Sequence, residues 1–374
     1  MQAAAALQPM RILSNALAIS IGLGGVPAHS TDDVPCFEAS EWLAADSLFF
    51  GDPHWVGADG AYSIDLGHDR TLWLFGDTWV DPSGRHTRQN AHMIRNSVAI
   101  QTGADPSNAT IKFYWQADAS DVPKAFFAQQ GGEWFWPGHG VRLDDRLIIF
   151  LNRLRGTSTG LGFASAGWNA VMIENPDDEP SNWRKRMLQT PENPLGIIVG
   201  FASTMRWKEY LYAFGSEDPV KTHPIYVARW PVAKVHEGDL ESPEWWGGVE
   251  IGWVPDASSA SRRPVIENGQ SELTVHASDG DHKFIAVQTV GFGKSDLAIR
   301  SAKELTGPWT PPNLIYRPPE YDRPNVMIYS AKAHPQLAGA DLVVTYSTNT
   351  FKFQEHLTDS RIYYPRFVRL ERCN

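Results

Sequence analysis

The sequence predicts an all-β protein, a five-bladed β-propeller, and three observations lead to this fold. Five strand–turn–strand hairpins recur along the chain, and each of the first four is followed by two further strand-like runs. The fifth hairpin is followed by one run only, after which the chain stops. A segment near the N-terminus is available to supply the missing strand. Radial repetition of four-stranded units is the architecture of a propeller.

The composition is that of a globular protein and limits its partners. Of the 374 residues, 42% are hydrophobic and 20% are charged, which excludes disordered, collagen-like and coiled-coil chains. The net charge of −10 comes without a basic cluster, so we expect neither nucleic acid nor a membrane surface as partner. Because one round core rarely grows beyond about 250 to 300 residues, the chain either splits into domains or repeats a small core.

The five hairpins share polar or glycine-bearing turns between β-branched or aromatic flanks. The predicted strand pairs are residues 61–66 and 71–75, 141–143 and 146–150, 204–207 and 210–214, 273–276 and 283–288, and 333–337 and 341–346. Their turns begin at residues 67, 144, 208, 278 and 338, which are 77, 64, 70 and 60 residues apart. Spacing of this order is typical of propeller blades and solenoids.

Further strand-like runs complete the repeats. The predicted third strands are residues 97–101, 169–174, 225–230, 296–301 and 366–370, and the fourth strands are 111–115, 186–189, 249–253 and 313–316. Trp183, Trp245 and Trp309 stand at equivalent places between these runs, so we interpret them as blade packing. No strong helix is predicted. The rival fold, two β-sandwiches, lacks a linker and does not explain five similar hairpins.

The first 30 residues are typical of a secretory signal peptide, with Met10 as the more natural start. The apolar run over 12–26 is shorter than the ~20 residues that a membrane-spanning helix needs. We therefore expect export to the periplasm or the extracellular space. Residues 31–374 are then predicted to form a single five-bladed catalytic domain.

The only two cysteines, Cys36 and Cys373, lie near the two ends of the chain. In an oxidising compartment the simplest pairing is a disulfide between them. The segment around Cys36 would supply the outer strand of the fifth blade and cover its edge, and the bond would lock the ring. On the chain-entropy model, which is disputed, closing so long a loop contributes about 5 kcal/mol.

Three carboxylates are predicted to converge on the propeller axis, which the innermost strand of every blade lines. Asp59 and Asp77 flank the first strand pair, and Glu272 precedes the fourth hairpin. Most glycoside hydrolases use a pair of carboxyl groups as their catalytic residues. Asp77 follows an apolar run that would raise its pKa, so we expect it to be the acid, and Asp59, in a polar turn, the nucleophile or base. Glu272 would tune the pair or replace either member.

Asp59 and Asp77 could instead have a structural role only, because aspartate is common in turns such as that of Asp59 and Asp77 could simply end a strand. Other side chains near the funnel are candidates for substrate binding: Arg95, Asn96, Trp79, Trp136, His139, Arg142, Lys332 and His334. Among these, Lys332 could instead be a surface charge, His334 a turn residue, and Arg95 the partner of a blade carboxylate. No zinc motif, phosphate-binding loop or nucleophile elbow occurs. We therefore expect no cofactor and no metal, and nothing in the sequence supports a structural calcium.

Residues 57–63 (GADGAYS) and 72–78 (LWLFGDT) resemble the five-bladed propeller glycoside hydrolases. The resemblance is closest to the endo-D-arabinanase group, glycoside hydrolase family 183, formerly a domain of unknown function. It continues in residues 93–97, 329–335 and 362–367, and so covers most of 45–372. It implies cleavage of D-arabinan, with Asp59 and Asp77 catalytic. Broader relatives hydrolyse L-arabinan, xylan or fructan, and some cleave mannosides with phosphate.

The leading hypothesis is a secreted, monomeric glycoside hydrolase that cleaves a furanose-rich polysaccharide or oligosaccharide. Two alternatives remain open. One is a propeller that binds carbohydrate without catalysis, and the other is a propeller glycosidase or phosphorylase with a different sugar specificity.

Overall fold

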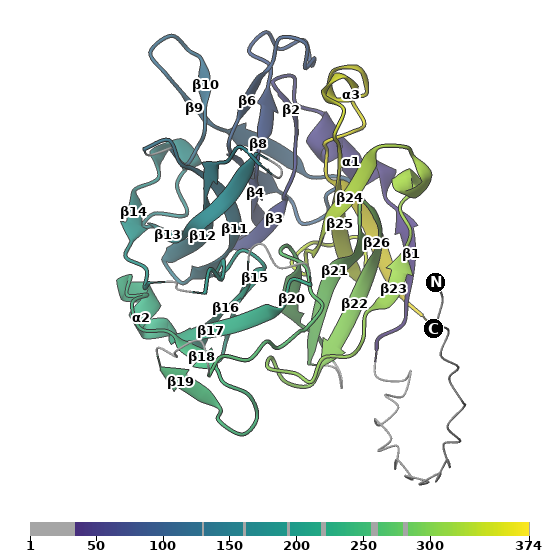
Figure 1. Ribbon diagram of the computed structural model, residues 1–374. Helices are drawn as coiled ribbons and strands as arrows, with labels where there is room; N and C mark the ends of the chain where they lie inside the picture. The colour runs from purple at the N-terminus through teal and green to yellow at the C-terminus, as the bar shows by residue number, and fades with distance from the viewer. Residues whose placement is uncertain are drawn as a thin grey trace, which may run out of the picture. The chain divides into compact units, whose positions relative to one another are not determined.

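The computed structural model of the protein describes residues 34–128, 131–159, 162–192, 195–217, 222–255, 261–279 and 283–373. The predicted signal peptide lies outside these residues. Within them, strand pairing forms five antiparallel sheets of four or five strands and two smaller sheets (Figure 1). The prediction of an all-β chain is therefore confirmed.

The first two large sheets begin at their inner strands and run outward in chain order. The first contains β3 (Tyr62–Gly67), β4 (Arg70–Phe75), β7 (Ser97–Thr102) and β8 (Thr110–Tyr114). The second contains β11 (Trp134–Leu143), β12 (Arg146–Gly156), β13 (Phe163–Ile173) and β14 (Lys185–Leu188). Both hairpins form at the predicted turns, although the strands of the second are longer than the predicted ones because they extend past the hydrophobic run.

The remaining three sheets follow the same plan. The third contains β15 (Ser203–Trp207), β16 (Tyr210–Ser216), β17 (Ile225–Pro231), β18 (Glu244–Trp246) and β19 (Trp253–Pro255). The fourth contains β20 (Thr274–Ala277), β21 (Phe284–Phe292), β22 (Lys294–Ala302) and β23 (Asn313–Tyr316). The fifth contains β24 (Val326–Ala333), β25 (Leu342–Thr350), β26 (Arg366–Arg372) and β1 (Phe37–Glu41).

The inner strands of successive sheets lie next to one another. Strand β3 contacts β11, β11 contacts β15, β15 contacts β20, and β20 contacts β24. Between the fifth sheet and the first, Ser63 Oγ lies 2.6 Å from His334 Nδ1, and Ser330 Oγ donates to Gly60 O at 3.1 Å. The five sheets therefore surround a common axis, which is the arrangement of a five-bladed β-propeller.

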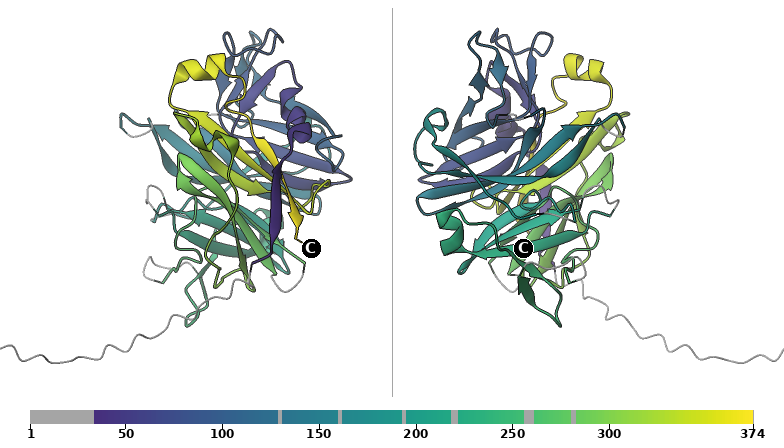
Figure 2. Two further views of the ribbon diagram at one scale, coloured as in Figure 1. Left: turned by 90° about the vertical axis from the view of Figure 1, so that its right-hand side faces the viewer. Right: turned by 60° about the vertical axis from the view of Figure 1, so that its left-hand side comes forward.

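The fifth sheet joins the two ends of the described chain, as predicted. Strand β1 pairs antiparallel with β26 from Phe37 opposite Arg372 to Glu41 opposite Val368. Figure 2 shows this purple strand beside the yellow end of the chain. A disulfide links Cys36 to Cys373, whose Cα atoms lie 5.5 Å apart. The N-terminal segment therefore covers the edge that β26 would otherwise expose.

Apolar cores fill the spaces between adjacent sheets. Trp183, Trp245 and Trp309 are 6%, 4% and 8% exposed and belong to these cores, which agrees with the blade-packing interpretation. A further core holds the short helix α1 (Leu43–Phe50), whose Phe49 stacks on Phe367 of β26 with ring centroids 5.1 Å apart. Side-chain burial between sheets is thus the main stabilising contribution to the ring.

Two predicted strands were placed wrongly. The inner strand of the fifth sheet is β24 and ends at Ala333, because residues 334–337 form a turn in which Leu337 N donates to His334 O at 3.0 Å. The fourth strand of the third sheet is β18, so the Trp245 that was expected before that strand lies within it. In the fifth blade the signal that was missed is Pro335, because proline lacks the N–H that a strand donates and favours a turn.

Short helices and two small sheets occupy the connections. The helical segments are α1, α2 (Val232–Glu237), α3 (Phe353–Thr358), η2 (Pro180–Asn182) and η3 (Pro319–Asp322). The small sheets are β2 (Trp55–Ala58), β5 (Thr78–Val80) and β6 (His92–Ile94), and β9 (Gln116–Ala117) with β10 (Pro123–Lys124). In the described residues, no helix is long and apolar enough to cross a membrane. In Figure 1 both small sheets and α3 lie at the upper end of the blades.

Candidate active site

The small sheet of β2, β5 and β6 brings Asp59 and Asp77 together. Strands β2 and β5 are antiparallel, with Ala58 opposite Thr78. Asp59 is the residue after β2 and Asp77 the residue before β5, so a continued register sets them opposite each other. The backbone agrees with this register, since Gly76 N donates to Asp59 O at 3.0 Å. Carboxylates 18 positions apart in the sequence therefore become neighbours in space.

Two glycines make room for this arrangement. A Cβ atom on Gly76 would lie 2.6 Å from Asp59 Oδ1, closer than real Cβ contacts. Gly57 adopts φ +121°, and its Cβ would lie 2.5 Å from Tyr363 O. Only glycine combines this backbone conformation with so close an approach. Gly76 is thus required by the approach of the Asp59 carboxylate, and Gly57 by the approach of the loop that contains Tyr363.

Asp77 accepts hydrogen bonds from a cation and from an indole. Its Oδ2 lies 3.2 Å from Arg95 Nη1, and its Oδ1 accepts from Trp136 Nε1 at 2.9 Å. Burial raises the pKa of the Asp77 carboxyl, whereas the charge of Arg95 and these two hydrogen bonds lower it. The side chain is still 15% exposed. Arg95 also lies over the ring of Trp134, 4.2 Å from its centroid, so it acts as the partner of a carboxylate.

Asp59 has phenols and other carboxylates around it. Its Oδ2 accepts from the Tyr329 hydroxyl at 2.6 Å, and the Tyr363 hydroxyl is a second hydrogen-bond partner. Burial raises the pKa of Asp59 to about 7, and the charges of Glu272 and Asp77 add to this rise against the opposing Tyr329 hydrogen bond. The sequence analysis expected Asp59 to stay charged and Asp77 to be the acid. Burial raises the pKa of both carboxyls, and Asp77 has in addition a cation, Arg95, in direct contact that opposes the rise.

Glu272 is held by a buried lysine. It lies two residues before β20, and its Oε2 accepts from Ser330 Oγ at 2.7 Å and from Lys332 Nζ at 2.5 Å. Lys332 is fully buried, with its Nζ 4.0 Å from the centroid of the Tyr62 ring. It is therefore neither a surface charge nor exposed to a ligand. Burial lowers the pKa of Lys332, and the Glu272 charge opposes this shift.

Two of the predicted substrate-binding residues are structural. Asn96 is fully buried: its Nδ2 donates to Phe127 O at 3.2 Å and Phe135 O at 2.8 Å, while its Oδ1 accepts from Phe127 N at 2.7 Å. Trp79 is 4% exposed and packs near Phe353, with ring centroids 6.0 Å apart. Neither side chain presents a free face to a sugar. Of the two predicted tryptophans, only Trp136 is partly exposed beside a candidate carboxylate.

The two predicted histidines fill the propeller axis. His139 Nδ1 accepts from Thr204 N at 3.0 Å, and its Nε2 lies 3.1 Å from Ser63 O. His334 is fully buried, with Nδ1 2.6 Å from Ser63 Oγ and Nε2 2.8 Å from Thr345 Oγ1. Burial lowers the pKa of both imidazoles, that of His139 to about 4. Both are neutral at pH 7, with their ring nitrogens engaged by the protein.

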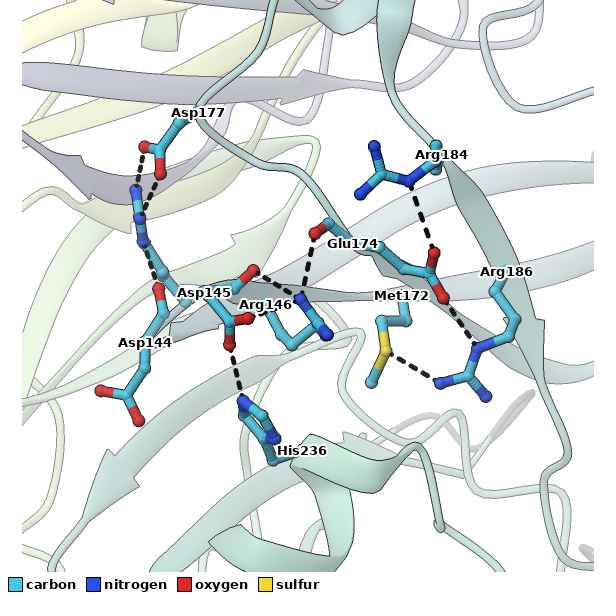
Figure 3. Close-up of polar contacts among 10 residues, drawn as sticks. Asp144, Asp145, Arg146, Met172, Glu174, Asp177, Arg184, Arg186 and His236 are labelled. Atoms are coloured by element: carbon cyan, nitrogen blue, oxygen red, sulfur yellow. Dashed lines mark hydrogen bonds and ion pairs between the residues drawn. The ribbon is translucent and has the colours of Figure 1, made fainter.

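Arg142 was predicted to bind substrate, but it lies at the hairpin turns, away from Asp59 and Asp77. Its Nη1 and Nη2 donate to the two carboxylate oxygens of Asp177 at 2.7 and 2.9 Å, and its Nε donates to Asp144 O at 2.8 Å. Figure 3 shows Asp144 and Asp177 in the polar network of this region, which extends through Asp145. Arg142 therefore ties the second blade to the loop after β13.

Tyr329 and Tyr363 are the site residues that sequence reasoning did not select. Tyr329 belongs to β24, and Tyr363 lies in the loop before β26 with φ +68°. The segments that contain them were noted for their resemblance to a family, but their approach to Asp59 depends on ring closure. Among the described residues, no group of three or more His, Cys, Asp or Glu side chains is placed to hold a metal ion.

Fold and site together define a class: an all-β propeller with neighbouring carboxylates at one end of its inner strands. The chain belongs to the family described as Domain of unknown function (DUF5005), whose model matches residues 44–372. No curated protein matches it in sequence.

Solved structures share the fold. A Bacteroides ovatus protein named "putative hydrolase" has a TM-score of 0.68 at 17% identity, over 89% of this chain and 90% of that one. A Dyadobacter fermentans protein of unknown function has a TM-score of 0.52 at 8% identity, over 91% and 100% of the two chains. The catalytic domain of a Coprinopsis cinerea GH62 α-L-arabinofuranosidase has a TM-score of 0.48 at 8% identity, over 91% and 98%. At 17% and 8% identity, the first two comparisons support the fold alone.

Proposed function

We propose that the protein is an exported glycoside hydrolase that cleaves a furanose-rich polysaccharide such as D-arabinan. The observation that carries the proposal is the pairing of Asp59 and Asp77 in surroundings of different charge. Burial, together with the charges of Glu272 and Asp77, raises the pKa of Asp59 to about 7 against the opposing hydrogen bond from Tyr329, whereas Asp77 contacts Arg95. Two carboxyl groups whose surroundings separate their pKa values are the acid and base pair of glycoside hydrolysis.

In this proposal Asp59 carries the proton and gives it to the glycosidic oxygen as the bond to the anomeric carbon breaks. Asp77 is the carboxylate that either attacks the anomeric carbon or removes a proton from the attacking water. Arg95 and Trp136 hold the Asp77 carboxylate by its two oxygens, which fixes its direction. Water supplies the hydroxyl group at the new reducing end. If Asp77 attacks the anomeric carbon, Asp59 regains its proton from the water that hydrolyses the covalent intermediate; if Asp77 takes the proton of the attacking water, that proton passes to solvent and Asp59 is reprotonated from solvent.

Three further observations support parts of the proposal. The similar fold of a protein named as a hydrolase agrees with hydrolysis. The motifs around Asp59 and Asp77, which resemble endo-D-arabinanases, favour D-arabinan as substrate. The disulfide between Cys36 and Cys373 favours export, since disulfides persist in oxidising compartments. Residues 31–374 are proposed to act as one monomeric catalytic domain.

The decisive experiment offers the purified protein D-arabinan, L-arabinan and xylan, each with and without phosphate, and measures new reducing ends. We expect hydrolysis of D-arabinan, and loss of at least about 10³-fold in rate with Asp59→Asn or Asp77→Asn. Asp121→Asn is the matched control, because Asp121 is exposed in a turn with φ +59°, a conformation that asparagine also tolerates. Binding without cleavage of any glycan would contradict the proposal, as would full activity of the Asp77→Asn protein.

A further inference from the structure

A cavity lies on the propeller axis, at the end of the inner strands opposite to Asp59 and Asp77. Its volume is about 700 Å³, and the inner strands of all five blades contribute to its walls. The lining residues come from the hairpin ends of these strands and include Asp65, Arg142, Thr204, Arg206, His276 and Gln336. None of the three candidate catalytic carboxylates lines it. Cavities of about 300 to 1,000 Å³ are typical of small-molecule sites.

Buried side chains separate this cavity from the candidate active site. The Tyr62 ring lies against Lys332, and its centroid is 5.7 Å from that of the His139 ring. The Tyr62 hydroxyl donates to Phe201 O, which anchors the ring across the axis. His334 is fully buried beside Ser63. The axis is therefore filled between the two ends, and a ligand in the cavity would not contact Asp59 or Asp77.

Two buried polar side chains that line the cavity have no hydrogen-bond partner in the structure. Thr204 is 3% exposed and His276 is 8% exposed, yet Thr204 Oγ1 and His276 Nδ1 are both unpartnered. Leaving a buried polar group unpaired costs about 1 to 3 kcal/mol, and native proteins contain few such groups. A ligand with hydroxyl groups would supply partners for both atoms.

The charges around the cavity indicate an uncharged ligand. Arg142 is bound through both Nη atoms to Asp177, and Arg206 Nη1 lies 3.6 Å from Asp144 Oδ1. Burial lowers the pKa of His276 to about 4, so that its imidazole is neutral at pH 7. Both arginines that line the cavity are thus paired with carboxylates, which disfavours an anion as ligand. Apolar side chains such as Val141 and Val275 also line the walls and can contact C–H groups.

We propose that this axial cavity is a second carbohydrate site, which binds a neutral mono- to trisaccharide. The hydroxyl groups of the sugar pair with Thr204 and His276, and its C–H faces contact the apolar wall. This inference does not depend on the proposed hydrolysis, because it concerns binding at the opposite end of the axis.

The test counts binding sites by isothermal titration calorimetry with arabinotriose, xylotriose and inorganic phosphate at up to about 10 mM, which reveals millimolar affinities. It uses the Asp77→Asn protein so that no trisaccharide is consumed. We expect Thr204→Val to weaken one trisaccharide site about tenfold, since one hydrogen bond is lost. Thr204→Val combined with His276→Phe should reduce the number of sites by one. Thr110→Val is the matched control, because Thr110 is exposed on β8.

Hydrolysis by the Thr204→Val and Thr110→Val proteins, each with Asp77 intact, is measured in parallel. We expect both to match the parent protein, so a failure of the proposed hydrolysis is seen separately from a failure of the second site. An unchanged number of sites in folded variants would overturn the inference. Saturable binding of phosphate but of neither trisaccharide would overturn it as well. Because Thr204→Val preserves side-chain shape, it keeps the inference testable even where His276→Phe impairs folding.

Discussion

Replacing Asp59 by asparagine should abolish hydrolysis and yet stabilise the folded protein above pH 7. Burial raises the pKa of Asp59 from 3.8 to about 7. Between these two pH values the native state holds a proton that the unfolded state has released, so this group makes the native state less stable as the pH rises. The stability that the protonated carboxyl contributes is fully present below pH 3.8 and is lost as the pH passes about 7. Asparagine carries no charge and avoids this loss.

The size of the effect follows from the shift in pKa. A shift of roughly 3 units corresponds to about 4 kcal/mol as an upper bound, at about 1.36 kcal/mol per unit. Because Asp59 is partly exposed, solvent screening reduces the gain in stability to about 2 kcal/mol. The hydrogen bond from Tyr329 is kept, since its hydroxyl can donate to the asparagine oxygen as it does to the carboxylate. For a chain of this length that is a rise of about 3 °C in Tm.

The assay is thermal unfolding of parent, Asp59→Asn and Asp121→Asn proteins at pH 4 and pH 8.5, followed by circular dichroism. The Asp59→Asn protein should unfold at a higher temperature than its parent at pH 8.5 and at nearly the same temperature at pH 4. The Asp121→Asn protein should follow the parent at both. An equal difference in Tm at the two pH values would refute the reasoning, because the effect would then not come from the ionisation of Asp59.

Three further outcomes are expected. Arg95→Leu removes the cation beside Asp77 and so raises the pKa of that carboxyl. The acidic limb of the pH–rate profile should therefore move up by about 1 pH unit. An unmoved limb would argue against Asp77 as the essential carboxylate. Cys36→Ser should lower the free energy of unfolding by up to about 5 kcal/mol, and hydrogen exchange should show that β1 loses protection before the other strands do. Lys332→Met leaves Glu272 without its counter-charge and should cost about 3 kcal/mol in urea unfolding, of which Glu272→Gln in the same protein should recover part.

Much of the ring could be predicted from the sequence because local patterns determine its hairpins. The turn at residues 67–70 lies between runs that form β3 and β4 within one residue of the prediction. The inner strand of the fifth hairpin was misplaced, since residues 334–337 contain Pro335, which favours a turn, and they form a turn after β24. The pairing of β1 with β26 could be predicted only because the fifth repeat lacked a strand and two cysteines marked the ends.

The site could be predicted less completely, for a physical reason. Asp59 and Asp77 were recognisable because they flank the first strand pair and lie in the motifs that resemble a family of glycoside hydrolases. Their surroundings were not, because Tyr329 and Tyr363 reach Asp59 from the fifth blade across the closed ring. The apolar run before Asp77 indicates the burial that raises the pKa of this carboxyl, but it does not reveal the opposing contact with Arg95.

The closure of the ring by β1 and β26 also determines when the protein can be completed during its synthesis. Strand β1 is made early and pairs with residues 368–372, which leave the ribosome more than 300 residues later. Until then β1 and β25 each keep an open edge that can pair with another chain. A prematurely terminated chain would keep both edges exposed, so cellular quality control could recognise incomplete molecules by the absence of their last strand.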